Sequence, residues 1–153
     1  MHEHASYRGA YVWSYLPDLS VTWGETEAKR TMCWVQPPGT PSVGHCLLDA
    51  YHATGDETFL RAAERTGLAL VRAQLPVGGW NHLHDFADEA SLREWYDTVG
   101  AHGRRLEEFQ HHHGNAAFDD AGTSTAAQGS SGCTWSAGTR CSRRPCTASS
   151  TSC

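Results

Sequence analysis

The sequence predicts an all-α fold, built from αα-hairpins with long loops and followed by a disordered C-terminal tail. Three observations support this. Apolar residues between positions 41 and 75 recur with the period of a helix, a short link containing glycine divides them into two helices, and the composition changes near Gln128. We therefore divide the 153-residue chain into an irregular segment (1–40), a helical domain (41–127) and a tail (128–153).

Residues 1–40 are rich in aromatic side chains and show no clear apolar period. They lead into the stretch 36–41 (QPPGTP), and prolines and a glycine so close together are typical of a connection between elements. The chain starts with MHEH and lacks the charged and then apolar run of a secretion signal. As written, it is therefore expected to stay in the cytoplasm.

A first helix is predicted after this connection. Its apolar residues follow the spacing i, i+3, i+4, i+7 and i+8, and they are Val43, Cys46, Leu47, Ala50 and Tyr51. Cys46 would then be a small buried residue on this face. Gly55 is expected to end the helix.

A second helix is predicted to begin at Asp56, whose carboxylate can cap its first turn. One side of this helix carries Phe59, Leu60, Ala63, Gly67, Leu70, Val71 and Gln74. Because only residues 54–56 (TGD) join the two helices, we expect them to form an antiparallel αα-hairpin.

Residues 81–103 show weaker periodicity. We predict one short helix at about residues 90–98 within a long loop, and long loops in compact domains often carry functional residues. A further helix is expected to start at about Asp119.

The tail differs from the rest of the chain in composition. All 17 acidic residues come before Ala121, and after Phe118 the chain has no Leu, Ile, Val, Met, Phe or Tyr. Such a segment cannot bury enough apolar surface to offset an ordering cost of about 1–2 kcal/mol per residue. We expect it to be disordered, either as an ordinary low-complexity tail or as the product of a shifted reading frame.

The shifted-frame hypothesis follows from codon structure. In the shifted frame, the third base of each codon is read together with the first two bases of the next codon. The first base of that next codon then becomes the middle base, so TCN serine, TGY cysteine and TGG tryptophan codons all supply a middle T. Codons with a middle T encode apolar residues. Read this way, the tail has apolar positions with helical spacing at 142, 146, 149, 150 and 153. The cysteines of the tail would then be by-products of the frame, not parts of a disulfide framework.

A motif marks the end of the predicted hairpin. Residues 74–80 (QLPVGGW) have the spacing Q-x3-G-x-W that is seen at hairpin ends in α/α toroids such as terpene cyclases and several polysaccharide lyases. The Gln74 amide can tie one helix end to the next backbone, the glycines permit a tight reversal, and Trp80 can cover the junction.

The stretch AYHATGDETFLRAAERTGLALVRAQLPVGGW, followed by HDF and GNAAFDD, resembles the pectic acid lyase family, the family-10 pectate lyases and their relatives. The resemblance covers about residues 30–127. It implies an incomplete α/α toroid with a cleft for polygalacturonate, an acidic polysaccharide. It also implies cleavage by calcium-assisted β-elimination with an arginine base, in a parent protein that is secreted or periplasmic. This chain itself, as a fragment, is expected to be inactive.

Calcium would neutralise the uronate carboxylate while the neighbouring proton is removed, and it prefers oxygen ligands. Asp119 and Asp120 match the family's acidic motif and are its predicted ligands, although Phe118 replaces the polar first residue. The alternative is that Asp119 caps a helix and Asp120 lies in its first turn. No arginine lies in a motif that matches the family's base, so no catalytic residue is assigned.

The predicted sugar contacts lie in two places. The first follows the hairpin, where a toroid faces its cleft, and comprises Trp80, His82, His84 and Asp85. The second comprises His112 and Asn115. His112 is the middle one of three consecutive histidines, whose side chains point in different directions and so are not expected to share a zinc ion. The alternative for both groups is packing or solvation of the loops.

Composition excludes several classes of function. The acidic net charge of −5 argues against nucleic acid as a partner. The chain contains no run of 18 apolar residues, which a membrane-spanning helix would need.

Two alternatives to the lyase interpretation stay open. One is a non-catalytic glycan-binding helical domain, which the aromatic segment favours, and the other is a terpene-cyclase-like or protein-interaction toroid fragment.

Overall fold

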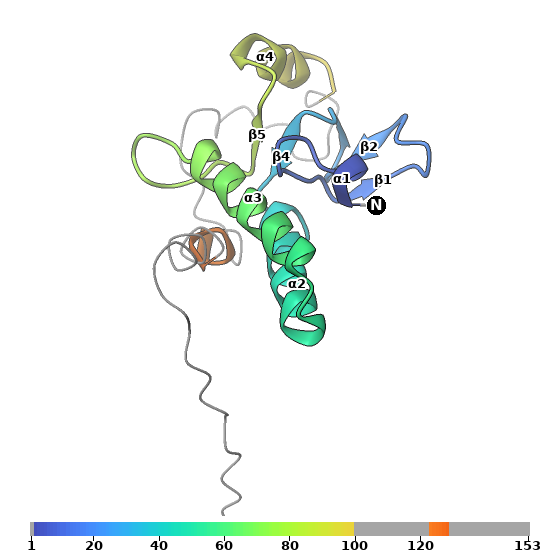
Figure 1. Cartoon of the computed structure of the whole chain (residues 1–153). Helices are drawn as coiled ribbons and strands as arrows, with labels where there is room; N and C mark the ends of the chain where they lie inside the picture. The colour runs from blue at the N-terminus through green and yellow to red at the C-terminus, as the bar shows by residue number, and fades with distance from the viewer. Residues whose placement is uncertain (1, 100–122, 129–153) are drawn as a thin grey trace, which may run out of the picture.

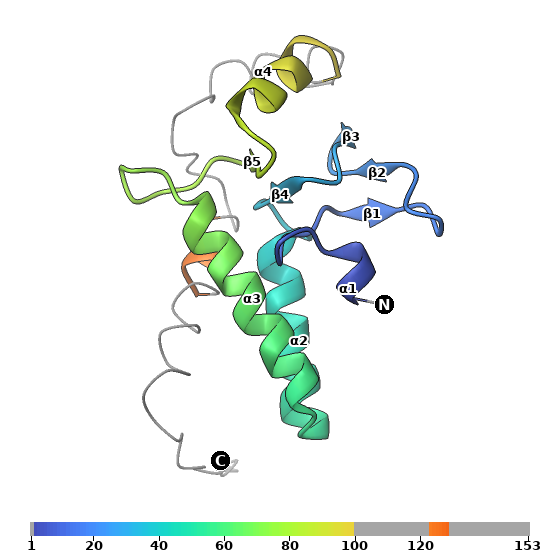
Figure 2. The same ribbon diagram turned by 45° about the horizontal axis from the view of Figure 1, so that its top comes forward.

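The computed structural model describes residues 2–99 and 123–128 (Figure 1). In chain order, its elements are α1 (His2–Ala5), β1 (Ser14–Tyr15), β2 (Thr22–Trp23), β3 (Glu27–Ala28), β4 (Met32–Trp34), α2 (Thr40–Thr54), α3 (Glu57–Ala73), β5 (Leu83–Asp85) and α4 (Glu89–Asp97). Residues 123–128 are also helical. The hairpin of α2 and α3 extends away from the strands, which gather with α4 at its open end (Figures 1 and 2).

The described part of the chain is not all-α, so the predicted fold class, an incomplete α/α toroid, is wrong. Strands β1, β2 and β3 form one antiparallel sheet, and β4 pairs with β5 in a second. Four of these strands lie within residues 1–40, which were expected to be irregular. Strands of two or three residues are too short to show a period of two, so the sequence pattern did not reveal them.

The antiparallel αα-hairpin is confirmed. Pro41 lies in the first turn of α2, where its missing N–H is not needed, and Gly55 closes the helix with a left-handed φ of 73°. The carboxylate of Asp56 accepts a hydrogen bond of 2.8 Å from the backbone N–H of Thr58, so it caps α3 as expected.

Small residues bring the two helices together. A Cβ atom at Gly44 would lie 3.1 Å from Cγ2 of Thr66, and Leu47 packs with alanines of α3 in one core cluster. The interpretation of Cys46 as buried is wrong, because this residue is exposed. It is two residues from Gly44, or about 200° around the helix, and therefore points away from the contact with α3.

The turn after α3 has the structure that the Q-x3-G-x-W motif predicts. The Gln74 amide donates a hydrogen bond of 2.7 Å to the carbonyl oxygen of Gly78, which has a left-handed φ of 92°. The Trp80 indole N–H donates one of 2.8 Å to the carbonyl oxygen of Leu70, so its ring covers the end of the hairpin.

Strand β4 is buried because it lies between two core clusters. Cys33 faces the cluster formed with Leu70 and Trp80, whereas Met32 and Trp34 face the second cluster. The alternation of strand side chains therefore gives apolar contacts on both faces. This explains why β4 reads as a continuous apolar run, which resembles no amphipathic pattern.

Helix α4 covers the second cluster and confirms the short helix predicted at about residues 90–98. Trp95 of α4 meets Trp34 edge to face with ring centroids 6.2 Å apart, and its indole N–H donates to the carbonyl oxygen of Glu27 over 2.8 Å. This contact fixes α4 on the strands of the N-terminal segment. None of the described helices is long and apolar enough to span a membrane.

The remaining fold predictions concern residues at the C-terminal end. The helix predicted from about Asp119 is seen in residues 123–128, where Ala126 is fully buried in the first core cluster. The tail predicted to be disordered begins at Gln128, which is the last described residue and is helical; residues 129–153 lie outside the described residues.

Candidate functional site

The predicted sugar contacts of the first group lie on β5 and the turn before it. Trp80 is only 5% exposed, and its N–H is bonded within the fold. On β5, Asp85 is buried and His84 is half-buried, with its ring 4.9 Å from that of Phe86. Burial lowers the pKa of His84, partly offset by the charge of Asp85. His84 is therefore expected to be neutral at neutral pH.

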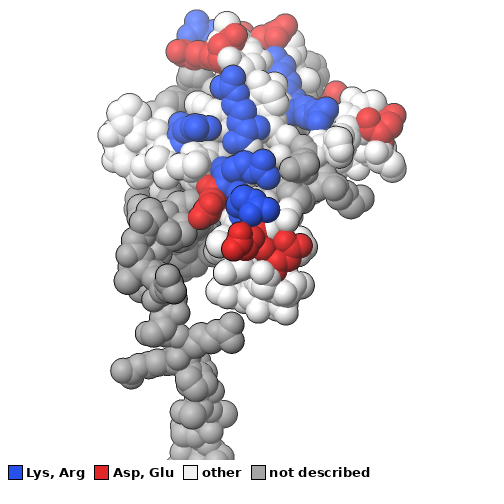
Figure 3. Space-filling view, in the orientation of Figure 1, with Lys and Arg blue, Asp and Glu red and all other residues white. Residues whose placement is uncertain are grey.

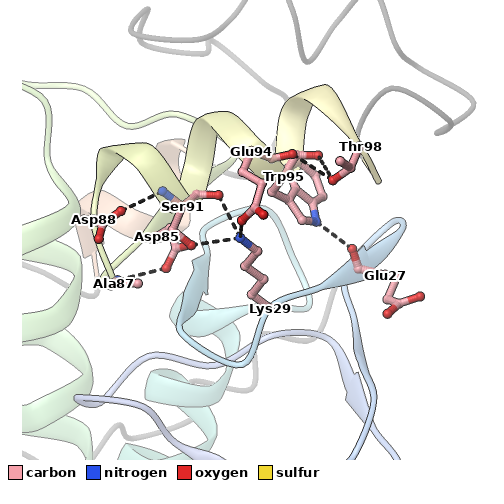
Figure 4. A network of polar contacts seen from close by, with 9 residues as sticks. All are labelled: Glu27, Lys29, Asp85, Ala87, Asp88, Ser91, Glu94, Trp95 and Thr98. Atoms are coloured by element: carbon pink, nitrogen blue, oxygen red, sulfur yellow. Dashed lines mark hydrogen bonds and ion pairs between the residues drawn. The ribbon is translucent and has the colours of Figure 1, made fainter.

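Asp85 anchors a network of polar contacts that connects β5 to α4 (Figure 4). Its Oδ1 accepts a hydrogen bond of 2.9 Å from the backbone N–H of Ala87, and its Oδ2 accepts one of 2.7 Å from the hydroxyl of Ser91. Lys29 then donates to the Ser91 hydroxyl, the Ser91 carbonyl and Glu94, each at 2.9 Å. The network fastens α4 to the loop before β4.

A serine hydroxyl beside a lysine amine is also the composition of a catalytic dyad. Here the Ser91 hydroxyl donates its proton to Asp85 and accepts a hydrogen bond from Lys29, so Lys29 is not placed as the base for Ser91. Both oxygens of Asp85 are likewise occupied by donors of the fold. We therefore interpret this network as a structural one that holds α4 against β5 and the loop before β4.

The other predicted site residues cannot be placed. His112, Asn115, Asp119 and Asp120 lie outside the described residues. Within residues 2–99 and 123–128, no cluster of three or more His, Cys, Asp or Glu side chains could hold a metal ion. Calcium binding at Asp119 and Asp120 stays a prediction.

The structure brings together a group of arginines that the sequence analysis did not select. Arg8, Arg65 and Arg72 line an open groove of about 680 Å³, together with Ser6, Gly9 and Leu68. Lys and Arg side chains gather across the middle of this face, over α3 (Figure 3). We call this surface the arginine groove. Its positive charge stands out in a chain whose net charge is −5.

The place of Arg8 depends on a tight turn. Backbone hydrogen bonds join Tyr7 and Ala10 in both directions, and Arg8 and Gly9 have φ values of 54° and 89°. Two left-handed residues in a row form a type I′ turn. A Cβ atom at position 9 would lie 2.3 Å from the carbonyl oxygen of Arg65, so only glycine allows the turn to contact α3.

Helical periodicity extends the charged face along α3. Arg61, Arg65, Leu68 and Arg72 follow the spacing i, i+4, i+7 and i+11, which places them on one side of the helix. A second, smaller hollow of about 380 Å³ lies beside Arg61, Arg65 and Leu68, and Arg61 also pairs with Glu57 over 3.3 Å. This spacing was visible in the sequence, whereas the approach of Arg8 was not.

A further hollow is lined by residues of α1 and of the hairpin of β1 and β2. Its volume is about 840 Å³, and its lining residues are His4, Ala5, Trp13, Ser14, Tyr15, Leu16, Pro17, Asp18 and Leu19. Its lining is mainly apolar. We call it the aromatic hollow.

Comparison of the chain with models of protein families, with curated proteins and with solved structures found no match.

Proposed function

We propose that this chain binds an acidic polysaccharide and does not cleave it. The observation that carries the proposal is the arginine groove, in which Arg8, Arg65 and Arg72 share one open surface. A guanidinium group binds a carboxylate through two parallel hydrogen bonds and keeps its charge at all physiological pH values. A row of such groups suits a ligand that carries carboxylates.

The spacing of the arginines favours a ligand with repeated charges. Arg65 and Arg72 are seven residues apart on α3, which corresponds to about 10 Å along the helix axis. A single carboxylate is too small to contact both, whereas a chain of uronate residues presents one carboxylate on each sugar. Leu68 lies between them and is 48% exposed, so it offers apolar contact to the C–H face of a sugar ring.

The residues that line the arginine groove favour binding of the polysaccharide without its cleavage. The described side chains that line it supply guanidinium groups and a hydroxyl, and among them is no carboxylate that could hold the calcium ion of a pectate lyase. The family's β-elimination would need ligands from elsewhere, such as the predicted Asp119 and Asp120. The proposal therefore assigns recognition, and not chemistry, to Arg8, Arg65 and Arg72.

Calorimetry with oligogalacturonates tests the proposal, with neutral galactose oligomers as the reference ligand. We expect Arg65→Gln and Arg72→Gln each to weaken oligogalacturonate binding about tenfold, which corresponds to roughly 1.4 kcal/mol. Raising the salt concentration should weaken binding further, because these charges are exposed to solvent. Arg93→Gln is the matched control, because Arg93 is an exposed arginine on α4 whose ion pair with Glu89 lies outside the groove.

Two results would contradict the proposal. Equal affinity for the neutral oligomer, or an equal loss in Arg93→Gln, would show that the groove does not recognise the carboxylates. Absorbance of unsaturated uronate that appears with polygalacturonate and calcium would show turnover and would overturn the claim that the chain only binds.

A further inference from the structure

The aromatic hollow presents carbon surface, because the polar atoms of its two aromatic side chains are used inside the fold. The indole N–H of Trp13 donates to the carbonyl oxygen of Gln36 over 2.9 Å. The Tyr15 hydroxyl accepts a hydrogen bond of 2.9 Å from the backbone N–H of Val12. Trp13 is also held edge to face against Trp34, with ring centroids 5.7 Å apart. The aromatic walls are therefore fixed in place before any ligand arrives.

Asp18 is the one carboxylate among the described residues that line this hollow, which also include His4, and Arg30 donates to the His4 carbonyl oxygen. Asp18 receives hydrogen bonds from the backbone N–H of Ser20 over 3.1 Å and from its hydroxyl over 2.7 Å, and both go to Oδ1. These bonds lower the pKa of Asp18, so the carboxylate is ionised at neutral pH. A carboxylate only accepts hydrogen bonds, and it repels anions. The hollow thus offers apolar walls, an acceptor and the opposite charge to the arginine groove.

The hollow and the groove are separated by a short piece of chain. His4 and Ala5 line the aromatic hollow, and the residues that follow, Ser6, Arg8 and Gly9, line the arginine groove. In both ribbon views this piece lies between α3 and the hairpin of β1 and β2 (Figures 1 and 2). A chain-like ligand that follows α3 can therefore reach the hollow by crossing residues 4–9.

We infer that the aromatic hollow binds an uncharged pyranose residue of the same polysaccharide, with the sugar ring against Trp13 and Tyr15 and its hydroxyl groups donating to Asp18. This inference rests on the proposed function. Carbon faces of sugar rings pack on aromatic side chains, and hydroxyl groups match a carboxylate acceptor. A uronate residue would place its own negative charge beside Asp18. The preferred ligand is thus a mixed chain, with acidic sugars along α3 and a neutral sugar beyond them.

The test compares two oligosaccharides that differ in one terminal sugar. One consists of uronate residues only, and the other has a neutral hexose in place of one terminal uronate. We expect the intact chain to bind the mixed ligand about fivefold more tightly, as one aromatic contact would provide. Trp13→Leu should remove this preference. Asp18→Asn should reduce it, because the repulsion of the uronate at this position is lost.

The two proposals fail in different ways. Arg65→Gln should weaken the binding of both ligands equally and leave the preference intact. If this variant bound both ligands as tightly as the wild type, the proposed function itself would be overturned. A folded Trp13→Leu variant that keeps the wild-type preference would overturn the assignment of the hollow. Because Trp13 also contacts the core, Leu16→Lys is the second variant. Leu16 is 38% exposed, and a positive charge there should attract the uronate and abolish the preference without loss of a cooperative melt. An unchanged preference in this variant would overturn the assignment as well.

Discussion

Replacement of Asp85 by alanine should destabilise the protein strongly. Asp85 is 3% exposed and accepts hydrogen bonds from the Ala87 backbone and from the Ser91 hydroxyl. Hydrogen bonds to a charged group contribute about 1.5–3 kcal/mol each. The Ser91 hydroxyl would keep the bond that it accepts from Lys29, but its own proton would lose its acceptor, because the lysine ammonium only donates. We expect a loss of about 3 kcal/mol, which lowers Tm by roughly 12–24 °C for a domain of about 100 residues.

Urea unfolding followed by tryptophan fluorescence measures this loss, because Trp95 lies beside the network on α4. Ser91→Ala should cost about 1.5 kcal/mol, and the double variant should show a coupling of about 1 kcal/mol with Asp85. The control is Arg93→Ala, which removes an exposed ion pair of 3.4 Å with Glu89 and should leave the midpoint unchanged. If Asp85→Ala were as stable as this control, the network would not hold α4 in place.

Three further predictions concern single positions. Gly9→Ala should destabilise the fold by about 2–3 kcal/mol in thermal melts and weaken oligogalacturonate binding, because its Cβ would clash with the Arg65 carbonyl oxygen; unchanged stability would contradict the contact of the turn with α3. Burial lowers the pKa of His84, so the folded state binds fewer protons, and stability should fall as the pH drops below about 6.5. His84→Gln should flatten this slope of Tm against pH, and an identical slope would assign it to other groups. Cys46 should react with a thiol reagent in the native protein while Cys33 does not, because burial raises the pKa of Cys33 to about 12; peptide mass mapping would identify the labelled residue.

Local signals in the sequence were sufficient to predict the hairpin and its ends. The apolar spacing in α2 and α3, the cap at Asp56 and the stop at Gly55 depend on residues that are close in the chain. The tie between Gln74 and Gly78 is also local. Such features need only helix geometry and the hydrogen-bonding capacity of each side chain, so they can be read without knowledge of the tertiary structure.

The sheet of β4 and β5 was missed because its signal is not local. Trp34 of β4 pairs with Leu83 of β5, and the whole αα-hairpin lies between them in the sequence. With three residues in each strand, no alternation distinguishes them from loops. The aromatic residues of the N-terminal segment, which were counted as irregular, instead supply the core on which α4 packs. The toroid resemblance therefore extended a correct hairpin into a wrong fold.

The candidate site could be predicted only in part from the sequence, for a related reason. The arginine spacing on α3 is a periodic pattern, but the apolar face of that helix carries the signal that predicts the fold. Arg8 joins the groove through a type I′ turn and through a contact of Gly9 with the Arg65 backbone, and neither can be read from spacing. Conversely, Trp80 and Asp85 have the side chains of a sugar site but are used by the fold.

The reading-frame hypothesis can now be tied to a structural contact. The helix at residues 123–128 places Ala126 in the core beside Cys33 and Trp80, so the chain still contributes to the core two residues before the change in composition at Gln128. A helix that packs on a core normally continues with large apolar residues at helical spacing, and Trp135 is the only large apolar side chain of the encoded tail. The hypothesis predicts that the coding DNA beyond Gln128, read in the shifted frame, encodes such residues. Stop codons there, or a sequence without helical periodicity, would leave the low-complexity tail as the correct interpretation.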